Sequence, residues 1–137
     1  DALSKGVKLS TVNIMAMDFG SSYDNGGQME VAALYGAFST AYELQGLISG
    51  LSYKSAAQMT GITPMIGQND TSSEVFTISN AQQLVSDAHT YGFGFLSFWS
   101  ATRDYPCPGG ATGSPASGSC SGVSSSSQQY SGIFKSF

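Results

Sequence analysis

The stretch VNIMAMDFG, residues 12–20, is a mostly apolar run that ends in a carboxylate, an aromatic ring and a glycine. A continuous apolar run is typical of a strand in a parallel sheet that is covered on both faces. Because an isolated charge is costly to bury, Asp18 is expected where the strand leaves the core. The stretch therefore predicts a buried parallel strand over residues 11–18, with Asp18 pointing into a ligand site.

Two helices are predicted between this strand and the next two. The first begins near Met29, with Glu30 on its solvated side. Its apolar positions recur at helical spacing: Ala33, Ala37, Ala41, Leu44, Ile48 and Leu51. The second is expected to open at a capping box formed by Ser79 and Gln82 and to stop near Gly92.

Two further strands are predicted over residues 61–66 (GITPMI) and 93–100 (FGFLSFWS). Asp70 follows the first of them and Trp99 lies at the end of the second. The order strand-helix-strand-helix-strand-helix indicates an α/β fold with a parallel sheet, in which ligands bind at the carboxyl ends of strands. Three such units leave sheet edges uncovered, and a (β/α)8 TIM barrel takes about 250 residues. The sequence therefore predicts one piece of a barrel.

Composition excludes several classes of function. The chain has 137 residues, a net charge of −4 and only 10% charged residues, against roughly 25% in an average domain. Its five basic residues are scattered singly, so no nucleic-acid partner is expected. No apolar run approaches the roughly 20 residues that span a bilayer, so no membrane partner is expected either.

Cys107 and Cys120 are the only cysteines, and they lie in a loop over residues 101–127 that is rich in Gly and Ser. Two cysteines in a flexible loop favour a disulfide, and hence an oxidising, secreted setting. A pair of reduced thiols is the alternative. A zinc site would need four ligands, and the only histidine, His89, lies in a predicted helix. We therefore expect no metal and no cofactor.

Several motifs together resemble the C-terminal part of glycoside hydrolase family 18, the chitinase family of secreted bacterial and fungal enzymes. VNIMAMDFG resembles its sixth barrel strand, GITPMIGQND its seventh, and FLSFWSATRDYPC its eighth. The closing segment CSGVSSSSQQYSGIFKSF is similar to the family's tail. The resemblance covers nearly all of residues 1–137. It implies strands six to eight of the barrel within a partial catalytic domain.

The resemblance also implies a substrate and a mechanism. Family members cleave β-1,4 bonds in chitin or related N-acetylglucosamine polymers by substrate-assisted retention. A glutamic acid protonates the leaving oxygen, and the N-acetyl carbonyl of the substrate attacks the anomeric carbon. The oxazolinium ion that forms requires nearby negative charge and hydrogen-bond acceptors.

Five residues carry over as sugar contacts. Asp18 matches the sixth-strand aspartate that contacts the reacting sugar, and Met17 occupies a position where many members have tyrosine. Phe19 replaces a tyrosine, so one hydroxyl is missing. Asp70 matches the seventh-strand aspartate, although it could equally cap the following turn. Trp99 matches the tryptophan floor on which the sugar ring stacks.

The family's catalytic signature, Asp-x-x-Asp-x-Asp-x-Glu, occurs nowhere in this sequence. We therefore expect no catalytic residue in this chain and no chitinase activity from it alone. The missing N-terminal part of the barrel is its expected partner. Two alternatives stay open: a non-catalytic barrel remnant that binds chitin, and a small complete α/β binding domain of another class. Arg103 and Asp104 are expected either to pair with each other or to steady the loop after the last strand.

Overall fold

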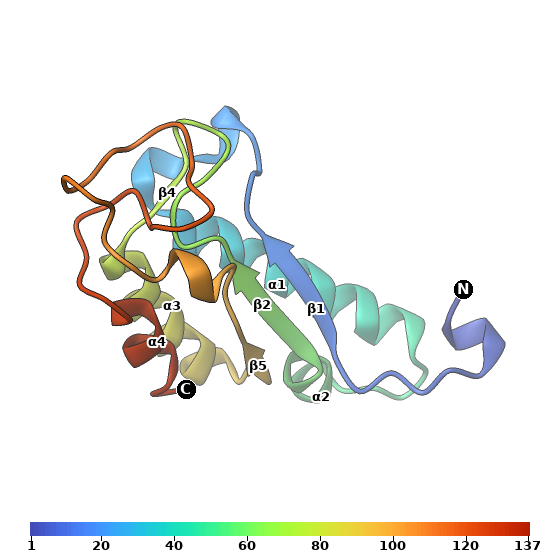
Figure 1. Cartoon of the computed structure of the whole chain (residues 1–137). Coiled ribbons are helices and arrows are strands. Elements are labelled where there is room, and N and C mark those ends of the chain that lie inside the picture. The colour runs from blue at the N-terminus through green and yellow to red at the C-terminus, as the bar shows by residue number, and fades with distance from the viewer.

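The computed structural model describes all 137 residues and contains a three-stranded parallel sheet (Figure 1). The strands β1 (Val12–Ala16), β2 (Thr60–Pro64) and β5 (Phe95–Leu96) pair in the order β1-β2-β5, all parallel. In this register Ile14 lies opposite Ile62, and Ile62 lies opposite Leu96. The predicted α/β class is confirmed, and β2 is the central strand.

Helices α1 (Met29–Leu47) and α3 (Ile78–Tyr91) follow β1 and β2, and α1 passes behind these two strands in Figure 1. The short helix α2 (Tyr53–Gln58) leads into β2, and α4 (Gln129–Phe134) packs on α3 near the C-terminus. A short hairpin follows the exit of β2, and its two strands, β3 (Gly67–Gln68) and β4 (Val75–Phe76), have two residues each. The remaining elements are single turns: η1 (Leu3–Lys5), η2 (Ser21–Tyr23), η3 (Asn25–Gly27) and η4 (Ala101–Arg103).

The helix that begins at Met29 is shorter than predicted. It ends at Leu47 because Ile48 adopts an extended conformation, and the separate helix α2 begins after Ser52. The Ser52 hydroxyl accepts the N–H of Ser55 and so caps α2. The spacing of apolar positions carried on past the end of the helix because Ile48 and Leu51 still pack against the same core.

The predicted capping box at Ser79 is wrong by two residues. Thr77 is the N-cap of α3, since its hydroxyl accepts the Asn80 N–H (3.2 Å) and the Asn80 side chain accepts the Thr77 N–H (2.7 Å). Asn80 thus occupies the position of the capping box at which the sequence pattern expects glutamine. The predicted stop is confirmed, because Gly92 ends the helix in a left-handed conformation (φ +73°).

Glu30 is not on a solvated side, contrary to expectation. It is buried, and the Asn80 amide donates a hydrogen bond to its carboxylate. The same amide also donates to the Gly27 carbonyl oxygen. The helical pattern failed here because a polar partner on α3 makes burial of this carboxylate tolerable.

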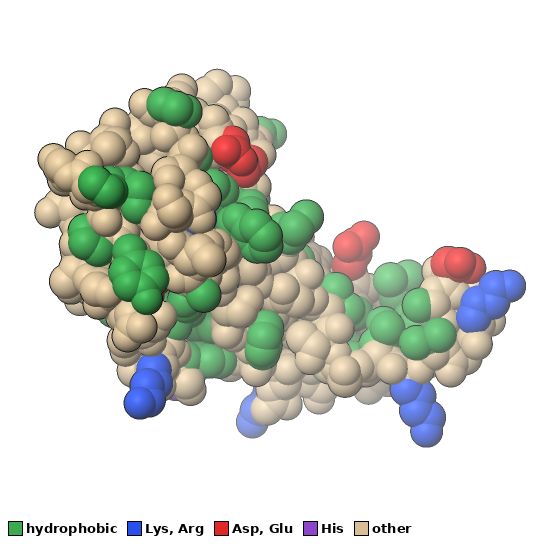
Figure 2. All heavy atoms as spheres, in the orientation of Figure 1, with side chains coloured by type: hydrophobic (Ala, Val, Ile, Leu, Met, Phe, Trp, Pro, Cys, Tyr) green, Lys and Arg blue, Asp and Glu red, His purple; other side chains and the backbone are tan.

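The helices cover one face of the sheet only. The apolar core lies between that face and the helices, and it is dominated by Ile62 and by small side chains that let the helices approach closely. On the other face Met15 is 78% exposed. Figure 2 shows apolar side chains exposed over the strands on this open side, with few charges among them. The prediction of a first strand covered on both faces is therefore wrong for this chain, because its own helices lie on one side.

Polar side chains from all three strands form a row across the open face. The Asn13 amide donates to the Thr63 hydroxyl (2.6 Å), and the Thr63 and Ser97 hydroxyls lie 2.7 Å apart. Alternation along parallel strands places these three residues on the same face as Met15 and Trp99. No helix of the chain is long and apolar enough to cross a membrane.

Gly94 tests the packing of α2 against the start of β5. A Cβ atom on Gly94 would lie 1.8 Å from the Gln58 carbonyl oxygen. We expect Gly94→Ala to lower the free energy of unfolding by about 2 kcal/mol or more, as overpacking does. The matched control is Gly46→Ala in α1, where a Cβ meets nothing within 4 Å; it should raise stability by roughly 0.5–1 kcal/mol. Urea unfolding of the protein with its barrel intact, followed by circular dichroism, measures both, and equal stabilities of the two variants would contradict the packing.

Candidate functional site

The exits of the three strands lie at one edge of the sheet, because all three strands are parallel. Trp99 is held there by backbone hydrogen bonds to the end of β2. Its N–H donates to the Pro64 carbonyl oxygen (2.8 Å), and its carbonyl oxygen accepts the Ile66 N–H (2.9 Å). The backbone is thus fixed while the side chain is 58% exposed. This arrangement presents an indole face at the sheet edge, and the Trp99–Ser100 peptide bond is cis.

Asp18 is exposed two residues beyond the end of β1, in a left-handed conformation (φ +49°). Its Oδ1 atom accepts the Thr71 N–H (3.0 Å), and its own N–H donates to the Asn69 side chain (3.4 Å). The exits of β1 and β2 are therefore tied together. The β1 and β5 strands are separated by two strand spacings, about 10 Å.

The other predicted contacts lie around this edge. Met17 is half-buried and follows β1 on the side of the open face, and Asp70 is exposed at the tip of the turn after β3. Phe19 is half-buried and packs against the core, where it also lines a groove beside α1 with Tyr23 and Tyr35. The Phe19 side chain therefore lies beside α1, whereas Asp18 lies at the exposed end of the sheet. The roles of all five residues in binding sugar stay predictions.

Two buried residues outside the five predicted sugar contacts organise this edge. Glu74 is fully buried, and its carboxylate accepts the N–H groups of Phe19 (3.1 Å) and Gly20 (2.6 Å). The buried Asn69 amide donates to the carbonyl oxygens of Met65 (2.9 Å) and Gly67 (3.1 Å). The amide of Asn69 thus closes its own turn, whereas Glu74 acts on backbone groups more than 50 positions away, which no local pattern could have identified.

The predicted disulfide between Cys107 and Cys120 is confirmed, and both cysteines are buried. The loop that it closes is fixed to the exit of β2, since the Gln68 N–H donates to the Ser121 carbonyl oxygen (2.8 Å). Gly67 is required at this contact, because a Cβ there would lie 1.9 Å from the same oxygen. The disulfide loop is thus fixed against the segment that follows β2.

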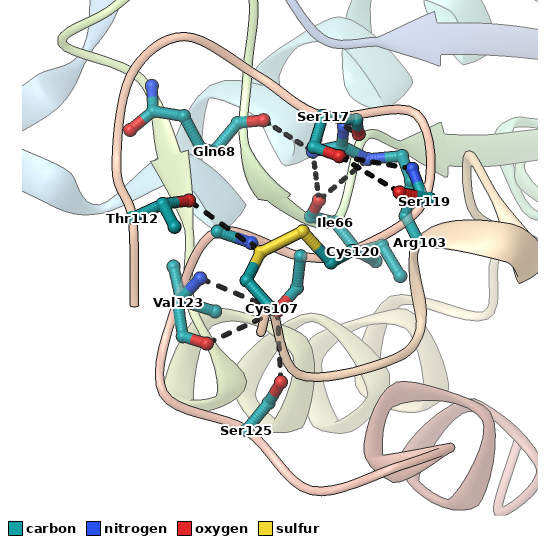
Figure 3. The surroundings of a disulfide bond; sticks show 12 residues. Ile66, Gln68, Arg103, Cys107, Thr112, Ser117, Ser119, Cys120, Val123 and Ser125 are labelled. Carbon is teal, nitrogen blue, oxygen red and sulfur yellow. Dashed lines mark hydrogen bonds between the residues drawn. A yellow bond between two sulfur atoms is a disulfide. The ribbon is translucent and has the colours of Figure 1, made fainter. Parts of the chain in front are cut away.

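Arg103 connects the disulfide loop to the segment that follows β2, as Figure 3 shows. Its side chain is 1% exposed and donates to the carbonyl oxygens of Ile66 (2.9 Å from Nη2), Gln68 and Ser117. Burial lowers the pKa of this guanidinium, and the negative charge of Asp70 acts in the opposite direction. An arginine stays protonated in proteins, so a permanent positive charge lies beneath the sheet edge.

Asp104 does not pair with Arg103 but anchors the last helix. Its carboxylate accepts the N–H of Tyr130 (3.0 Å) and both the N–H (2.7 Å) and hydroxyl (2.6 Å) of Ser131. Burial raises the pKa of the Tyr130 phenol, whose hydroxyl donates to the Phe76 carbonyl oxygen (2.6 Å). Of the two expectations for Arg103 and Asp104, steadying the loop is the one confirmed.

The chain has chitinases among its relatives. It is 36% identical over 121 residues to a probable bifunctional chitinase/lysozyme of Escherichia coli, a match that spans 84% of this chain and 13% of that protein. It is 36% identical over 112 residues to endochitinase 11 of Metarhizium anisopliae, across 77% of this chain and 22% of that protein. The chain thus spans less than a quarter of the length of these curated relatives. No family model matches it.

Solved structures agree with these relatives. The catalytic domain of a hyperthermophilic chitinase from Pyrococcus furiosus superposes with a TM-score of 0.86 at 34% identity, covering 97% of this chain and 41% of that one. A catalytic-site mutant of a chitinase domain from the same organism, complexed with chito-oligosaccharides, superposes with a TM-score of 0.82 at 33% identity. The similarity extends over most of the chain and supports a fragment of a chitinase of the glycoside hydrolase family 18 type.

Replacing Arg103 tests whether its guanidinium holds the disulfide loop against the segment that follows β2. We expect Arg103→Met to lower the free energy of unfolding by about 3 kcal/mol, because three carbonyl oxygens lose a charged donor. Arg103→Lys should recover only part of this loss, since an ammonium lacks the planar fork that reaches several acceptors. Chemical denaturation of the protein with its barrel intact measures the free energy of unfolding of both variants. Full stability in either variant would contradict the role of the guanidinium.

Proposed function

We propose that the protein containing this chain is a chitinase-type glycoside hydrolase that cleaves β-1,4 linkages between N-acetylglucosamine units. The observation that carries the proposal is the sheet edge, where an exposed indole stands about 10 Å, two strand spacings, from the strand that delivers Asp18. A pyranose ring stacks its C–H face on an indole, which also excludes water. The chitinase relatives support the same substrate class.

We propose further that β1, β2 and β5 are strands six to eight of a (β/α)8 barrel. In that arrangement the open face with Asn13, Thr63 and Ser97 is the barrel interior. The free edge of β1 would pair with the preceding strand. The groove of about 390 Å3 beside α1, lined by Phe19, Tyr23 and Tyr35 among others, would receive the preceding helix. The match to 41% of a Pyrococcus furiosus catalytic domain supports this reading.

The mechanism that we propose is substrate-assisted retention. A glutamic acid from a preceding strand protonates the leaving oxygen, and the N-acetyl oxygen of the substrate attacks the anomeric carbon to form an oxazolinium ion. Asp18 supplies negative charge near that cation, and its Oδ1 is already oriented by the Thr71 N–H. Trp99 is the floor under the reacting sugar. Met17 and Asp70 complete the wall, and Phe19 fixes the Asp18 loop from behind.

We also propose that the protein is secreted. The Cys107–Cys120 disulfide ties a loop rich in glycine and serine beside the site, and disulfides of this kind persist in oxidising compartments. In the chain-entropy model, a closed loop of this size stabilises the folded state by about 3 kcal/mol. Reduction of the disulfide in the cytosol would remove that stabilisation and loosen the loop between Cys107 and Cys120.

The chain alone should be inactive, because the acid is absent from it. Expressed by itself, it is expected to release no product from N-acetylglucosamine oligomers and to self-associate through the free edge of β1. Addition of the upstream part of the barrel should produce hydrolysis. A monomeric chain that unfolds cooperatively by itself would favour a complete α/β binding domain instead.

A non-catalytic chitin-binding role is the second candidate, because Trp99 is exposed while the chain carries no acid signature. Titration calorimetry of the isolated chain with N-acetylglucosamine oligomers separates the two functions. A barrel piece should bind negligibly, since the stacking platform lacks the opposite wall. Clear binding by the chain alone would favour the binding module.

Replacing Trp99 tests the stacking platform in the active protein. Trp99→Ala should weaken oligosaccharide binding by roughly ten- to a hundred-fold, because burial of a large aromatic surface contributes about 1.5–3 kcal/mol. Tyr91→Ala is the matched control. Tyr91 is also exposed, but it ends α3 at the opposite end of the sheet. Steady-state kinetics measure both, and equal effects would count against the platform.

A further inference from the structure

The backbone immediately after Asp18 is held by a buried carboxylate with no basic partner. Glu74 is 0% exposed, and the hydrogen bonds of its carboxylate come from two consecutive backbone N–H groups, those of Phe19 and Gly20. A buried carboxylate is costly unless it is fully hydrogen-bonded. Its position therefore depends on residues 18–20 keeping the conformation that aims both N–H groups at it.

That conformation is unusual for the residue that starts it. Asp18 has a φ of +49°, which is uncommon for a residue other than glycine. The left-handed turn directs the following N–H groups into the molecule and leaves the Asp18 carboxylate at the surface. Such an arrangement persists when surrounding contacts enforce it, and the Glu74 hydrogen bonds are the contacts that follow Asp18 directly.

The segment that carries Glu74 is itself rigid. The Asn69 N–H donates to the Glu74 carbonyl oxygen (3.0 Å), and the Glu74 N–H donates to the Thr71 carbonyl oxygen (2.9 Å). The buried Gln68 side chain donates to three carbonyl oxygens of the same turn. A turn closed in this way can transmit the position of β2 to the loop after β1.

We propose that Glu74 is a positioning residue that holds the Asp18 carboxylate at the sugar-binding edge. The inference rests on the proposed function, in which Asp18 acts on the reacting sugar. Glu74 touches no substrate and acts through the backbone of Phe19 and Gly20. Small displacements of a group that stabilises charge can cost two orders of magnitude in rate. Glu74 therefore sets kcat more than KM.

The test uses the protein with its barrel intact, in the variants Glu74→Gln and Glu30→Gln. Glutamine keeps the size of Glu74 but replaces one acceptor by a donor that opposes an N–H group. Glu30 is the matched control, since it is another buried carboxylate whose partner is the Asn80 amide on α3. Hydrogen-exchange mass spectrometry of residues 17–22, thermal unfolding and kinetics on N-acetylglucosamine oligomers are measured for each.

For Glu74→Gln we expect exchange in residues 17–22 to accelerate at least ten-fold, and kcat to fall ten- to a hundred-fold with KM changed less than three-fold. Glu30→Gln should leave both within two-fold of wild type. Unchanged exchange in Glu74→Gln, or a loss of kcat no larger than in Glu30→Gln, overturns the proposal. If Glu74→Gln does not fold, Glu74→Asp replaces it, because its shorter side chain withdraws the carboxylate from the two N–H groups.

Failure of the proposed function would look different. If the wild-type protein hydrolyses no N-acetylglucosamine oligomer, the chitinase proposal fails at that step, before any variant is compared. Faster exchange of residues 17–22 in Glu74→Gln would then still support the hold on Asp18, and unchanged exchange would overturn it as well.

Discussion

The turn over residues 69–74 holds together two parts of the chain that are more than 50 positions apart. It accepts or donates hydrogen bonds at Asp18, Phe19 and Gly20, and it connects β3 to β4 beyond the exit of the central strand. The ends of β1 and β2 are therefore one hydrogen-bonded unit rather than two independent loops. Everything proposed for the sugar site depends on this connection, because it determines where the Asp18 carboxylate lies relative to Trp99.

Most of the secondary structure could be predicted from the sequence, because local patterns determine it. The apolar face of α3 and its stop at Gly92 follow from helical spacing and from the left-handed conformation that glycine adopts easily. The disulfide and the positions of the three strands were also predicted, but the third strand is only Phe95–Leu96 within the expected range 93–100. The hairpin β3–β4 was not, since strands of two residues carry no periodicity and are defined by the turn and its tertiary contacts.

The candidate site divides in the same way. Asp18 and Trp99 could be identified because each ends an apolar run. Glu74 supports the site through backbone groups of another segment, and such a long-range partner leaves no trace in a single sequence. Glu30 was misassigned for a related reason, because its burial depends on an asparagine 50 positions later. The residues proposed to contact a ligand were thus easier to identify than the residues that position them.

The row of hydrogen bonds through Asn13, Thr63 and Ser97 has a consequence for how the strands align. Sliding β1 by one residue against β2 would exchange the two faces of the strand and drive the Asn13 amide into the layer beneath the helices, where it would lose its partner. The free-energy cost of burying the Asn13 amide without a hydrogen-bond partner disfavours the slipped alignment. The hydrogen bonds among these three side chains, on an otherwise apolar face, therefore specify how β1 aligns with β2. They thereby determine the position of Asp18 beyond the end of β1.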